Sequence, residues 1–267
     1  MDFSFIIPTY NRKEMTSKLI QKILEENIAS YEILVIDDCS DDNTVQYLLD
    51  RYSKVRVIES DKRRFVAHSR NLGIRESNAE TLVFCDSDID FRKGMLQSFL
   101  SDLEKGFNFP IIKFIDGVRM QWETSAFFAV PRSELSRFKE NYFDENIGIY
   151  GDDNDFFIRG RILNINFLYK DRYTFTHIKH SNSIKKNSYD DLRYYLAHRN
   201  SLYLAIKFRG IVEGYTWLRL FNRSSGHLLL AIYNIFCLRF KRAYLLLKGI
   251  VWMICNIPKC LLSKFKM

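Results

Sequence analysis

Three carboxylates follow a short apolar run in the first third of the chain. Leu82 to Cys85 predicts a buried strand, and Asp86, Asp88 and Asp90 come directly after it. Parallel strands of α/β proteins place ligands beyond their carboxyl ends, and carboxylates there suit Mg²⁺ or Mn²⁺ together with a phosphate group. The alternative is a Ser/Asp turn that only ends the strand.

The segments around this strand alternate between strand-like and helix-like patterns. Apolar runs predict strands at 3–7, 32–36, 55–59, 82–85, 107–116, 125–131 and 167–175. Helical periodicity predicts helices at 13–27, 44–52, 67–77, 155–163 and 191–209. This alternation indicates an α/β fold with a parallel sheet and helices on both faces. No glycine-rich loop follows the first strand, which excludes a P-loop and a dinucleotide fingerprint, so a metal and Arg would have to hold any phosphate.

The charge is distributed unevenly along the 267 residues. The chain carries +8 in total, but from Arg193 onward 13 Lys/Arg face the single acid Glu213, a net of +12 that leaves −4 for residues 1–192. A basic C-terminal segment favours a polyanionic partner. The five cysteines match no disulfide or metal spacing, and the start of the chain does not look like a signal peptide. We therefore expect reduced thiols in a cytoplasmic protein.

Several motifs occur in an order that resembles the family 2 glycosyltransferases. They are SFIIPTYNR, EILVIDDCSDDNT, HSRNLG, FCDSD, FAVPRSEL and FDENIGIYGDDNDFFIRG, and the resemblance covers about residues 3–205. It implies a GT-A fold, with a Rossmann-like, mixed and mostly parallel sheet flanked by helices. It also implies a catalytic domain at 1–210, divided into a nucleotide-sugar-binding half at 1–105 and an acceptor-binding half at 106–210. A C-terminal helical extension would follow at 211–267.

The resemblance implies two sets of ligands at the carboxyl edge of the sheet. Asp88 and Asp86 would bind Mn²⁺ or Mg²⁺, and His177 would complete the metal shell, with His180 as a competing candidate. The nucleotide would be bound by Pro8, Thr9, Tyr10, Asp37, Asp38, Arg70, Asn71, Asp86 and Ser87. An aromatic face such as that of Tyr10 suits a base. Judged without the family, the same positions could be a packed Tyr, an Asx turn and a solvated Arg.

The resemblance also places catalysis in the second acidic cluster, which follows Gly151. Asp153 aligns with the family's general base, whereas Asp152 stands where the family usually has Glu. Inverting sugar transfer needs the acceptor hydroxyl to lose its proton as it attacks, and a carboxylate can take that proton. The same cluster would also favour the first turn of a helix, and both roles are compatible. On the acceptor side we expect Trp122 and Phe127 to shape the site.

The C-terminal extension combines apolar runs with cations. Ser224 to Gly226 predicts a break, after which 227–238 and 244–257 are strongly apolar, each too short to span a bilayer. Arg239, Lys241 and Arg242 separate the two runs. This pattern predicts a basic amphipathic tail that lies on an anionic membrane, and the alternative is two helices packed on the domain.

We therefore expect an inverting, metal-dependent glycosyltransferase of the hexosyltransferase type. It would move sugar from a nucleotide-diphosphate sugar, with UDP preferred, to a glycan or lipid-linked glycan, as in bacterial surface polysaccharide synthesis. The protein would lie on the inner face of the cell membrane and bind no nucleic acid. The alternatives are a nucleotidyltransferase that makes sugar nucleotides, for which the first loop lacks glycines, and a non-enzymatic polyanion-binding protein.

Overall fold

The chain forms two compact units in the computed structural model. The structure describes residues 2–104, 106–114, 119–120, 125–139, 142–178, 186–213 and 217–264. The first unit comprises 1–148 and 156–180, and the second comprises 149–155 and 181–267. The predicted boundary between a nucleotide-binding and an acceptor-binding half at 105/106 stays a prediction.

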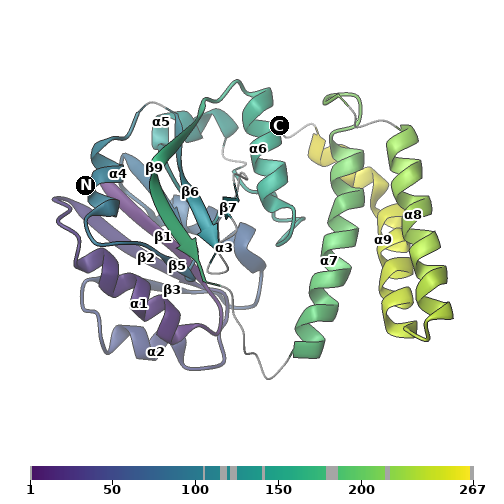
Figure 1. Ribbon diagram of the computed structural model, residues 1–267, viewed down its shortest axis with the longest axis horizontal. Helices are drawn as coiled ribbons and strands as arrows, with labels where there is room; N and C mark the ends of the chain where they lie inside the picture. The colour runs from purple at the N-terminus through teal and green to yellow at the C-terminus, as the bar shows by residue number, and fades with distance from the viewer. Residues whose placement is uncertain are drawn as a thin grey trace. The chain divides into compact units, whose positions relative to one another are not determined.

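One mixed sheet forms the centre of the first unit (Figure 1). Its strands are β1 (Phe3–Thr9), β2 (Tyr31–Asp37), β3 (Val55–Glu59), β4 (Thr81–Cys85), β5 (Ile89–Asp90), β6 (Phe107–Phe114), β7 (Arg119–Met120), β8 (Phe127–Pro131) and β9 (Phe167–His177). They are ordered β3-β2-β1-β4-β8-β6-β9-β5, with β7 on β6. The first four strands pair in parallel, as do β6 and β9, whereas β5, β7 and β8 run antiparallel to their partners. The carboxyl ends of β1, β2 and β4 therefore meet at one edge.

Helices cover both faces of this sheet. They are α1 (Lys13–Leu24), α2 (Thr44–Leu49), α3 (Phe65–Glu76), α4 (Met95–Ser101), α5 (Arg132–Leu135) and α6 (Asp152–Ile162). Alternate residues of β1 point to opposite faces, so Phe5 and Ile7 join the core under α1 and α4 while Ile6 joins the core under α3. Helix α3 approaches β1 closely, because a Cβ atom on Gly73 would come 2.4 Å from Cγ2 of Ile6. The predicted α/β architecture is confirmed.

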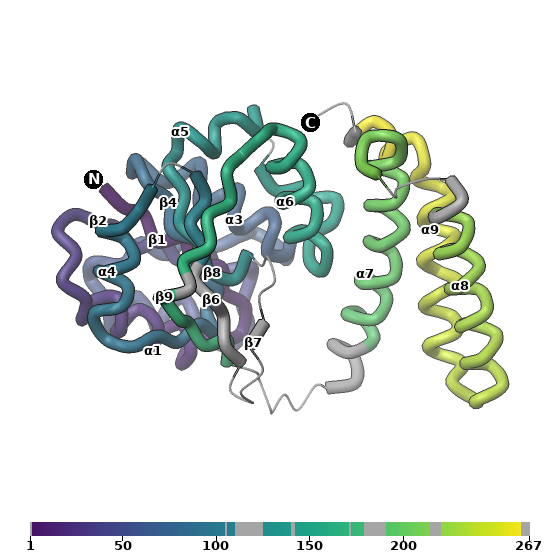
Figure 2. The backbone as a smooth tube through the Cα atoms, turned by 45° about the horizontal axis from the view of Figure 1, so that its top comes forward, coloured from purple at the N-terminus to yellow at the C-terminus, as the bar shows by residue number. Residues whose placement is uncertain are grey.

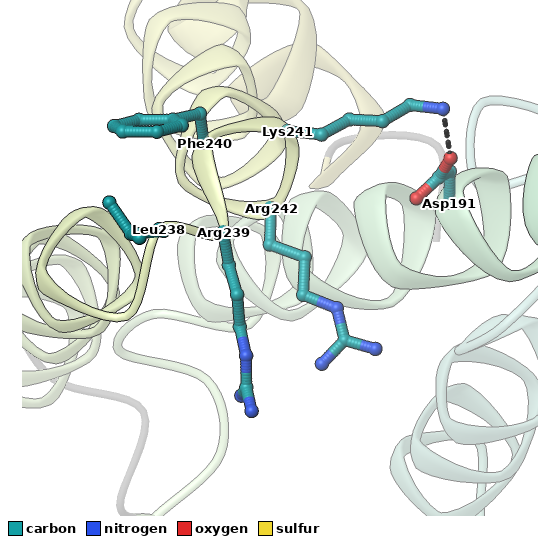
Figure 3. Close-up of a pocket in the computed structure, with 6 residues that line it drawn as sticks. All are labelled: Asp191, Leu238, Arg239, Phe240, Lys241 and Arg242. Carbon is teal, nitrogen blue, oxygen red and sulfur yellow. Dashed lines mark ion pairs between the residues drawn. The ribbon is translucent and has the colours of Figure 1, made fainter.

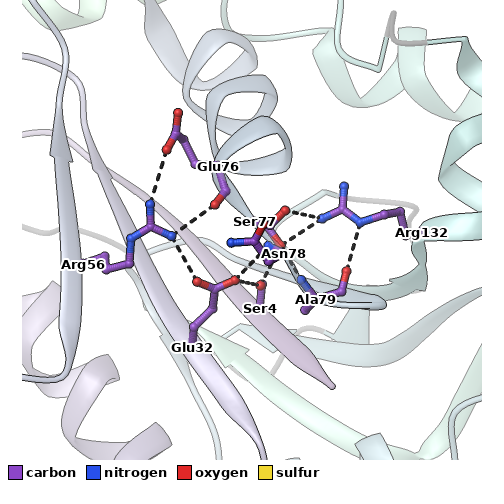
Figure 4. Close-up of polar contacts among 8 residues, drawn as sticks. All are labelled: Ser4, Glu32, Arg56, Glu76, Ser77, Asn78, Ala79 and Arg132. Atoms are coloured by element: carbon purple, nitrogen blue, oxygen red, sulfur yellow. Dashed lines mark hydrogen bonds and ion pairs between the residues drawn. The ribbon is translucent and has the colours of Figure 1, made fainter. Parts of the chain in front are cut away.

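A polar network fixes the amino-terminal ends of the parallel strands (Figure 4). The Glu32 carboxylate accepts hydrogen bonds from Ser4, from Arg56 at 3.2 Å and from the Asn78 amide at 3.1 Å. Arg132 donates to two carbonyls of the loop before β4, at 2.7 and 2.9 Å. These bonds lie at the end of the strands opposite the carboxyl edge, so they do not involve the side chains at that edge.

The second unit is built on three long helices, which run side by side in Figures 1 and 2. These are α7 (Lys186–Lys207), α8 (Trp217–Phe236) and α9 (Phe240–Lys264). Asn200 of α7 donates to the carbonyls of Ile149 and Tyr150 at 2.7 and 2.8 Å, so it holds the loop that leads into α6. Gly151 in this loop has φ +109°, a value that favours glycine.

Two predictions about this region were wrong. The expected break at Ser224 to Gly226 lies inside α8, which continues through it. The second apolar run is also longer than expected, because α9 is one helix of 25 residues. Polar and small residues do not interrupt α8, because its inward side is held on α7, where Arg223 donates to the carbonyl of Ser201 at 3.0 Å.

Candidate active site

The three residues predicted to bind metal converge at the carboxyl edge of the sheet. Asp86 and Asp88 follow β4, and His177 ends β9. One side-chain ligand atom from each lies within 4.8 Å of the others. Two carboxylate oxygens and an imidazole nitrogen are a ligand set that suits Mn²⁺ or a similar divalent cation.

The antiparallel pairing of β5 with β9 brings His177 to this position. Ile89 pairs with His177, and the amide of Ile178 donates to the carbonyl of Asp88 at 2.8 Å. As a result Nε2 of His177 lies 2.9 Å from Oδ1 of Asp88. His180, the competing candidate, lies outside the described residues.

Two arginines hold the carboxylates of this cluster. Arg12 donates from Nη1 to Oδ2 of Asp88 at 2.7 Å, and Arg70 donates from Nη2 to Oδ1 of Asp86 at 2.8 Å. Arg70 is only 2% exposed and also donates to the carbonyl of Ser125 at 3.1 Å. Arg70 was predicted at the site, whereas Arg12 was missed, although it stands in the PTYNR motif directly after the first strand.

The charges of the cluster shift the pKa values of its members. Burial opposes the charged imidazolium of His177, but its hydrogen bond to Asp88 and the charges of Asp88 and Asp86 outweigh burial and raise the pKa of His177. Burial alone would raise the pKa of Asp88, yet the contacts with His177 and Arg12 lower it. The Asp88 carboxyl group therefore favours its ionised form beside these two side chains.

The two carboxylates after β2 have local partners. Asp37 accepts hydrogen bonds from the amide and hydroxyl of Ser40 at 2.8 and 2.5 Å. Asp38 accepts from the amides of Arg64 and Phe65 at 2.7 and 2.9 Å, where α3 begins. Burial raises the pKa of both carboxyl groups despite these bonds. The predicted contacts to a base or ribose stay a prediction.

Tyr10 is half-buried, and the guanidinium of Arg63 stacks on its ring. The guanidinium carbon of Arg63 lies 3.9 Å from the centroid of the Tyr10 ring and 5.1 Å from that of Phe65. Arg63 was not predicted at the site, because the run Asp61 to Arg64 resembles an ordinary charged loop. A flat cation stacked on Tyr10 marks this ring as a stacking platform.

The other predicted nucleotide ligands differ in their surroundings. Thr9 is buried and its hydroxyl lies 2.8 Å from that of Thr16, while Pro8 is half-buried at the end of β1. Ser87 lies between the two metal-site carboxylates and is 3% exposed. Asn71 bonds both backbone groups of Phe143, at 2.8 and 2.9 Å. The predicted nucleotide contacts of these residues stay predictions.

The second acidic cluster starts α6 and belongs to the second unit. Asp152 is 4% exposed, and Asp153 is half-buried in the first turn. Asp155 is fully buried, with Oδ1 2.6 Å from Nζ of the equally buried Lys207 on α7. Asp155 thus forms a buried ion pair, and the predicted catalytic roles of Asp153 and Asp152 stay predictions.

Of the two residues predicted on the acceptor side, the structure describes Phe127. Phe127 is fully buried, and its ring stacks on Phe175 with centroids 3.9 Å apart and packs edge-on against Phe99. The acceptor contact predicted for Phe127 is thus wrong: β8 is a central strand, so this ring is covered on both sides. Trp122 lies outside the described residues.

Solved structures share this fold. The S. aureus TarS structure (residues 1–349, in complex with UDP-GlcNAc) superposes with a TM-score of 0.61 at 19% identity, over 80% of this chain and 68% of that one. The mannosyltransferase PcManGT from Pyrobaculum calidifontis, in complex with GDP-Man and Mn²⁺, gives 0.59 at 15% identity over 94% and 86% of the two chains. These neighbours are glycosyltransferases, and the predicted GT-A fold is confirmed.

Sequence comparison identifies the family. The UDP-Glc:alpha-D-GlcNAc-diphosphoundecaprenol beta-1,3-glucosyltransferase WfgD of Escherichia coli is 31% identical over 86 residues, 32% of this chain and 34% of that protein. The chain spans less than two fifths of the length of several curated relatives. The family model described as glycosyl transferase family 2 matches residues 4–167, well over half of the chain. The chain therefore belongs to glycosyl transferase family 2.

Proposed function

We propose that this protein is an inverting, metal-dependent glycosyltransferase that uses a nucleotide-diphosphate sugar. The observation that carries the proposal is the convergence of Asp86, Asp88 and His177 at the carboxyl edge of a family 2 sheet. Ligands of open α/β sheets bind at this edge. The nucleotidyltransferase alternative has no comparable support, since the matched family transfers glycosyl groups.

Asp86, Asp88 and His177 would hold the divalent cation, Mn²⁺ or Mg²⁺. When bound, such a cation offsets the negative charge that develops on a departing diphosphate. Arg12 and Arg70 orient the two carboxylates from outside the ligand set, at 2.7 and 2.8 Å. Because Arg70 is buried and also bonds a backbone carbonyl, Asp86 is held in one orientation.

Donor binding is assigned to the residues around β1 and β2. The Tyr10 ring with its stacked Arg63 offers a surface for a base, and Asp37 lies at the end of β2 for polar contacts. We take UDP as the nucleotide, with UDP-GlcNAc bound by the TarS neighbour and UDP-Glc in the name of the E. coli relative as support. Arg63 would move to the diphosphate when a base stacks on Tyr10.

Asp153 is proposed as the general base, with Asp152 beside it. Asp153 is half-buried, so its carboxylate can exchange protons with a bound hydroxyl, whereas Asp155 is fully buried against Lys207. The loop before it is fixed by Asn200 and by the positive φ of Gly151. A rigid loop keeps the carboxylate in position for proton transfer.

The acceptor is proposed to be a glycan or lipid-linked glycan of a surface polysaccharide. The diphosphoundecaprenol acceptor in the name of the E. coli relative and the poly(ribitol-phosphate) acceptor in the name of TarS support this class. The localisation that goes with such an acceptor is cytoplasmic, on the inner face of the cell membrane, with the C-terminal tail as the membrane-binding part.

The test is a screen of nucleotide sugars with the purified full chain and Mn²⁺. We expect one UDP-sugar to release UDP, faster when a lipid-linked glycan acceptor is added, and chelation by EDTA to stop the release. The double variant Asp86→Asn/Asp88→Asn should release no nucleotide from any donor. Turnover that survives both chelation and this double substitution would reject the proposed metal site.

A further inference from the structure

Helix α8 has its polar side turned inward. Arg223 donates to the carbonyl of Ser201 on α7 at 3.0 Å, and Nε2 of His227 lies 3.1 Å from Nδ1 of His198 on the same helix. Asn234 is only 3% exposed. An ordinary surface helix buries its apolar stripe and exposes its polar face, so α8 is inverted.

The outward side of α8 is correspondingly apolar. Its exposed large side chains are Phe221, Leu228, Leu229, Ile232, Tyr233, Ile235 and Phe236. Phe236, which ends the helix, is 82% exposed. Since contiguous exposed apolar surface of this extent is rare on soluble monomers, this side is a binding surface.

Helix α9 continues the surface with a regular stripe. Its exposed apolar side chains, spaced mostly three or four residues apart and so on one side of the helix, are Phe240, Tyr244, Leu247, Val251, Ile254 and Leu262. The opposite side of α9 buries Ala243, Leu246 and Met253. Helix α9 therefore has two apolar sides, one packed against its neighbours and another facing outward.

Cations border this surface, and among the described residues at the turn Asp191 is the acid beside them. Lys241, Lys248 and Lys259 of α9 are exposed, and their spacing places them along one line beside the stripe. From Gly214 to the end of the sequence there is no Asp or Glu. A surface with an apolar centre and a mainly basic border is complementary to lipid chains below a layer of phosphates.

The turn between α8 and α9 contains both exposed apolar side chains and cations. Leu238 is 77% exposed, and Figure 3 shows it with Phe240 on one side of the chain while Arg239 and Arg242 extend elsewhere. These residues, with Lys241 and Asp191, line an open hollow of about 540 Å³. Within the part of the chain that the structure describes, Asp191 is paired with Lys241, and no carboxylate is paired with Arg239 or Arg242.

A membrane-crossing α9 fits the structure less well than one lying in the interface. Phe240–Leu262 is long and apolar enough to cross a bilayer. However, the middle of α9 packs on α7, where the guanidinium carbon of Arg199 lies 4.7 Å from the centroid of the Trp252 ring. Crossing would bring this cation into hydrocarbon or separate the helices. A second copy of the chain is also disfavoured, because the two basic borders would face each other.

We propose that the outward apolar side of α8 and α9, together with their turn, docks onto an anionic bilayer. The exposed apolar side chains enter the interfacial layer, and Arg239, Arg242 and the border lysines bind lipid phosphates. This proposal does not depend on glycosyl transfer, since it rests on the second unit alone.

The first experiment is sedimentation of the full chain with phosphatidylcholine vesicles, with or without phosphatidylglycerol. We expect binding to the anionic vesicles, weakened at least about tenfold by Leu238→Ser/Phe240→Ser. Arg239→Gln/Arg242→Gln should weaken it similarly and reduce its salt dependence. The matched controls are Leu49→Ser, an exposed apolar residue of the first unit, and Lys54→Gln/Lys62→Gln, which removes equal charge there. Binding unchanged in the turn variants, or lost equally in the controls, would overturn the proposal.

A second experiment reports the docking side directly. Cys255 of α9 and Cys39 of the first unit are both exposed. Single-cysteine proteins labelled with an environment-sensitive dye should show a blue shift with anionic vesicles at Cys255 and none at Cys39. No shift at Cys255 would reject the membrane as the partner of this side. It would favour an acidic protein partner or a second copy instead. Retention on the vesicles after an alkaline carbonate wash would show a crossing helix instead.

Discussion

Nε2 of His177 lies 2.9 Å from Oδ1 of Asp88, although 89 positions separate the two residues. The contact depends on β5, a strand of two residues that pairs with the end of β9. This short strand therefore connects the acidic motif after β4 to the last strand of the sheet, and the proposed metal site needs both.

Asp88→Asn should abolish metal-dependent nucleotide binding. The substitution removes the charge that faces His177 and Arg12 while keeping the size of the side chain. We expect calorimetric affinity for UDP with Mn²⁺ to fall by at least about a hundredfold, the loss of more than 2 kcal/mol. Asp90→Asn is the control, because Asp90 pairs with Lys22 outside the cluster. Affinity in Asp88→Asn equal to that of the control would exclude Asp88 as a ligand.

Asp153→Asn should retain donor affinity and lose transfer. The amide is nearly isosteric but cannot accept the acceptor proton, and loss of a general base reduces turnover by about 10²- to 10⁴-fold. Calorimetry with UDP and rates with donor and acceptor measure the two effects separately. A variant that loses nucleotide affinity as severely as Asp88→Asn would contradict the assigned role.

Asp155→Asn should destabilise the protein rather than impair chemistry alone. It leaves the ammonium of Lys207 buried without its carboxylate, which costs about 3–5 kcal/mol in comparable buried pairs. Asp153→Asn, the same change two positions earlier on a half-buried side chain, is the matched control. Urea unfolding measures both, and equal midpoints would show that the buried pair contributes nothing.

The second unit should lose stability in mild acid through His227. Burial, and then the charges of His198 and Arg223, lower the pKa of His227 to about 4. The unfolded chain binds this proton near the ordinary value of 6.5 and the folded chain does not, so stability is complete above that value and falls as the pH drops toward 4. We expect a loss on the order of 1 kcal/mol, because solvent screens this half-buried imidazole, compared by urea unfolding at about pH 7.5 and about pH 5. His227→Gln should reduce the difference, and an unchanged difference would assign it to other groups.

Much of the first unit could be predicted from the sequence, because its strands are buried apolar runs that end in polar motifs. Val55–Glu59 was predicted to the residue, and Thr81–Cys85 to within one position. Helix α8 was not, since Ser224 to Gly226 resembles a turn unless the inner side of the helix is known to be polar. Such an inversion depends on the neighbouring helices and leaves no separate sequence signal.

At the candidate site, the sequence motifs predicted the proposed metal ligands but not the side chains that contact them. Asp86, Asp88 and His177 stand in motifs, and the structure brings them together. Arg12 was missed because its contact with Asp88 spans 76 positions and depends on the direction of one side chain. Phe127 was misassigned for the opposite reason: its motif is genuine, but burial in a central strand is a property of the sheet order.

The position of β9 also determines when the metal site can form during synthesis. His177 leaves the ribosome after β1, β2 and β4 are complete, and its pairing with Ile89 closes a long loop of chain. Contacts of such sequence separation form slowly. A nascent chain that has paired only β1 to β4 would present Asp86 and Asp88 without His177, so the complete set of proposed ligands requires the strand that is synthesised last.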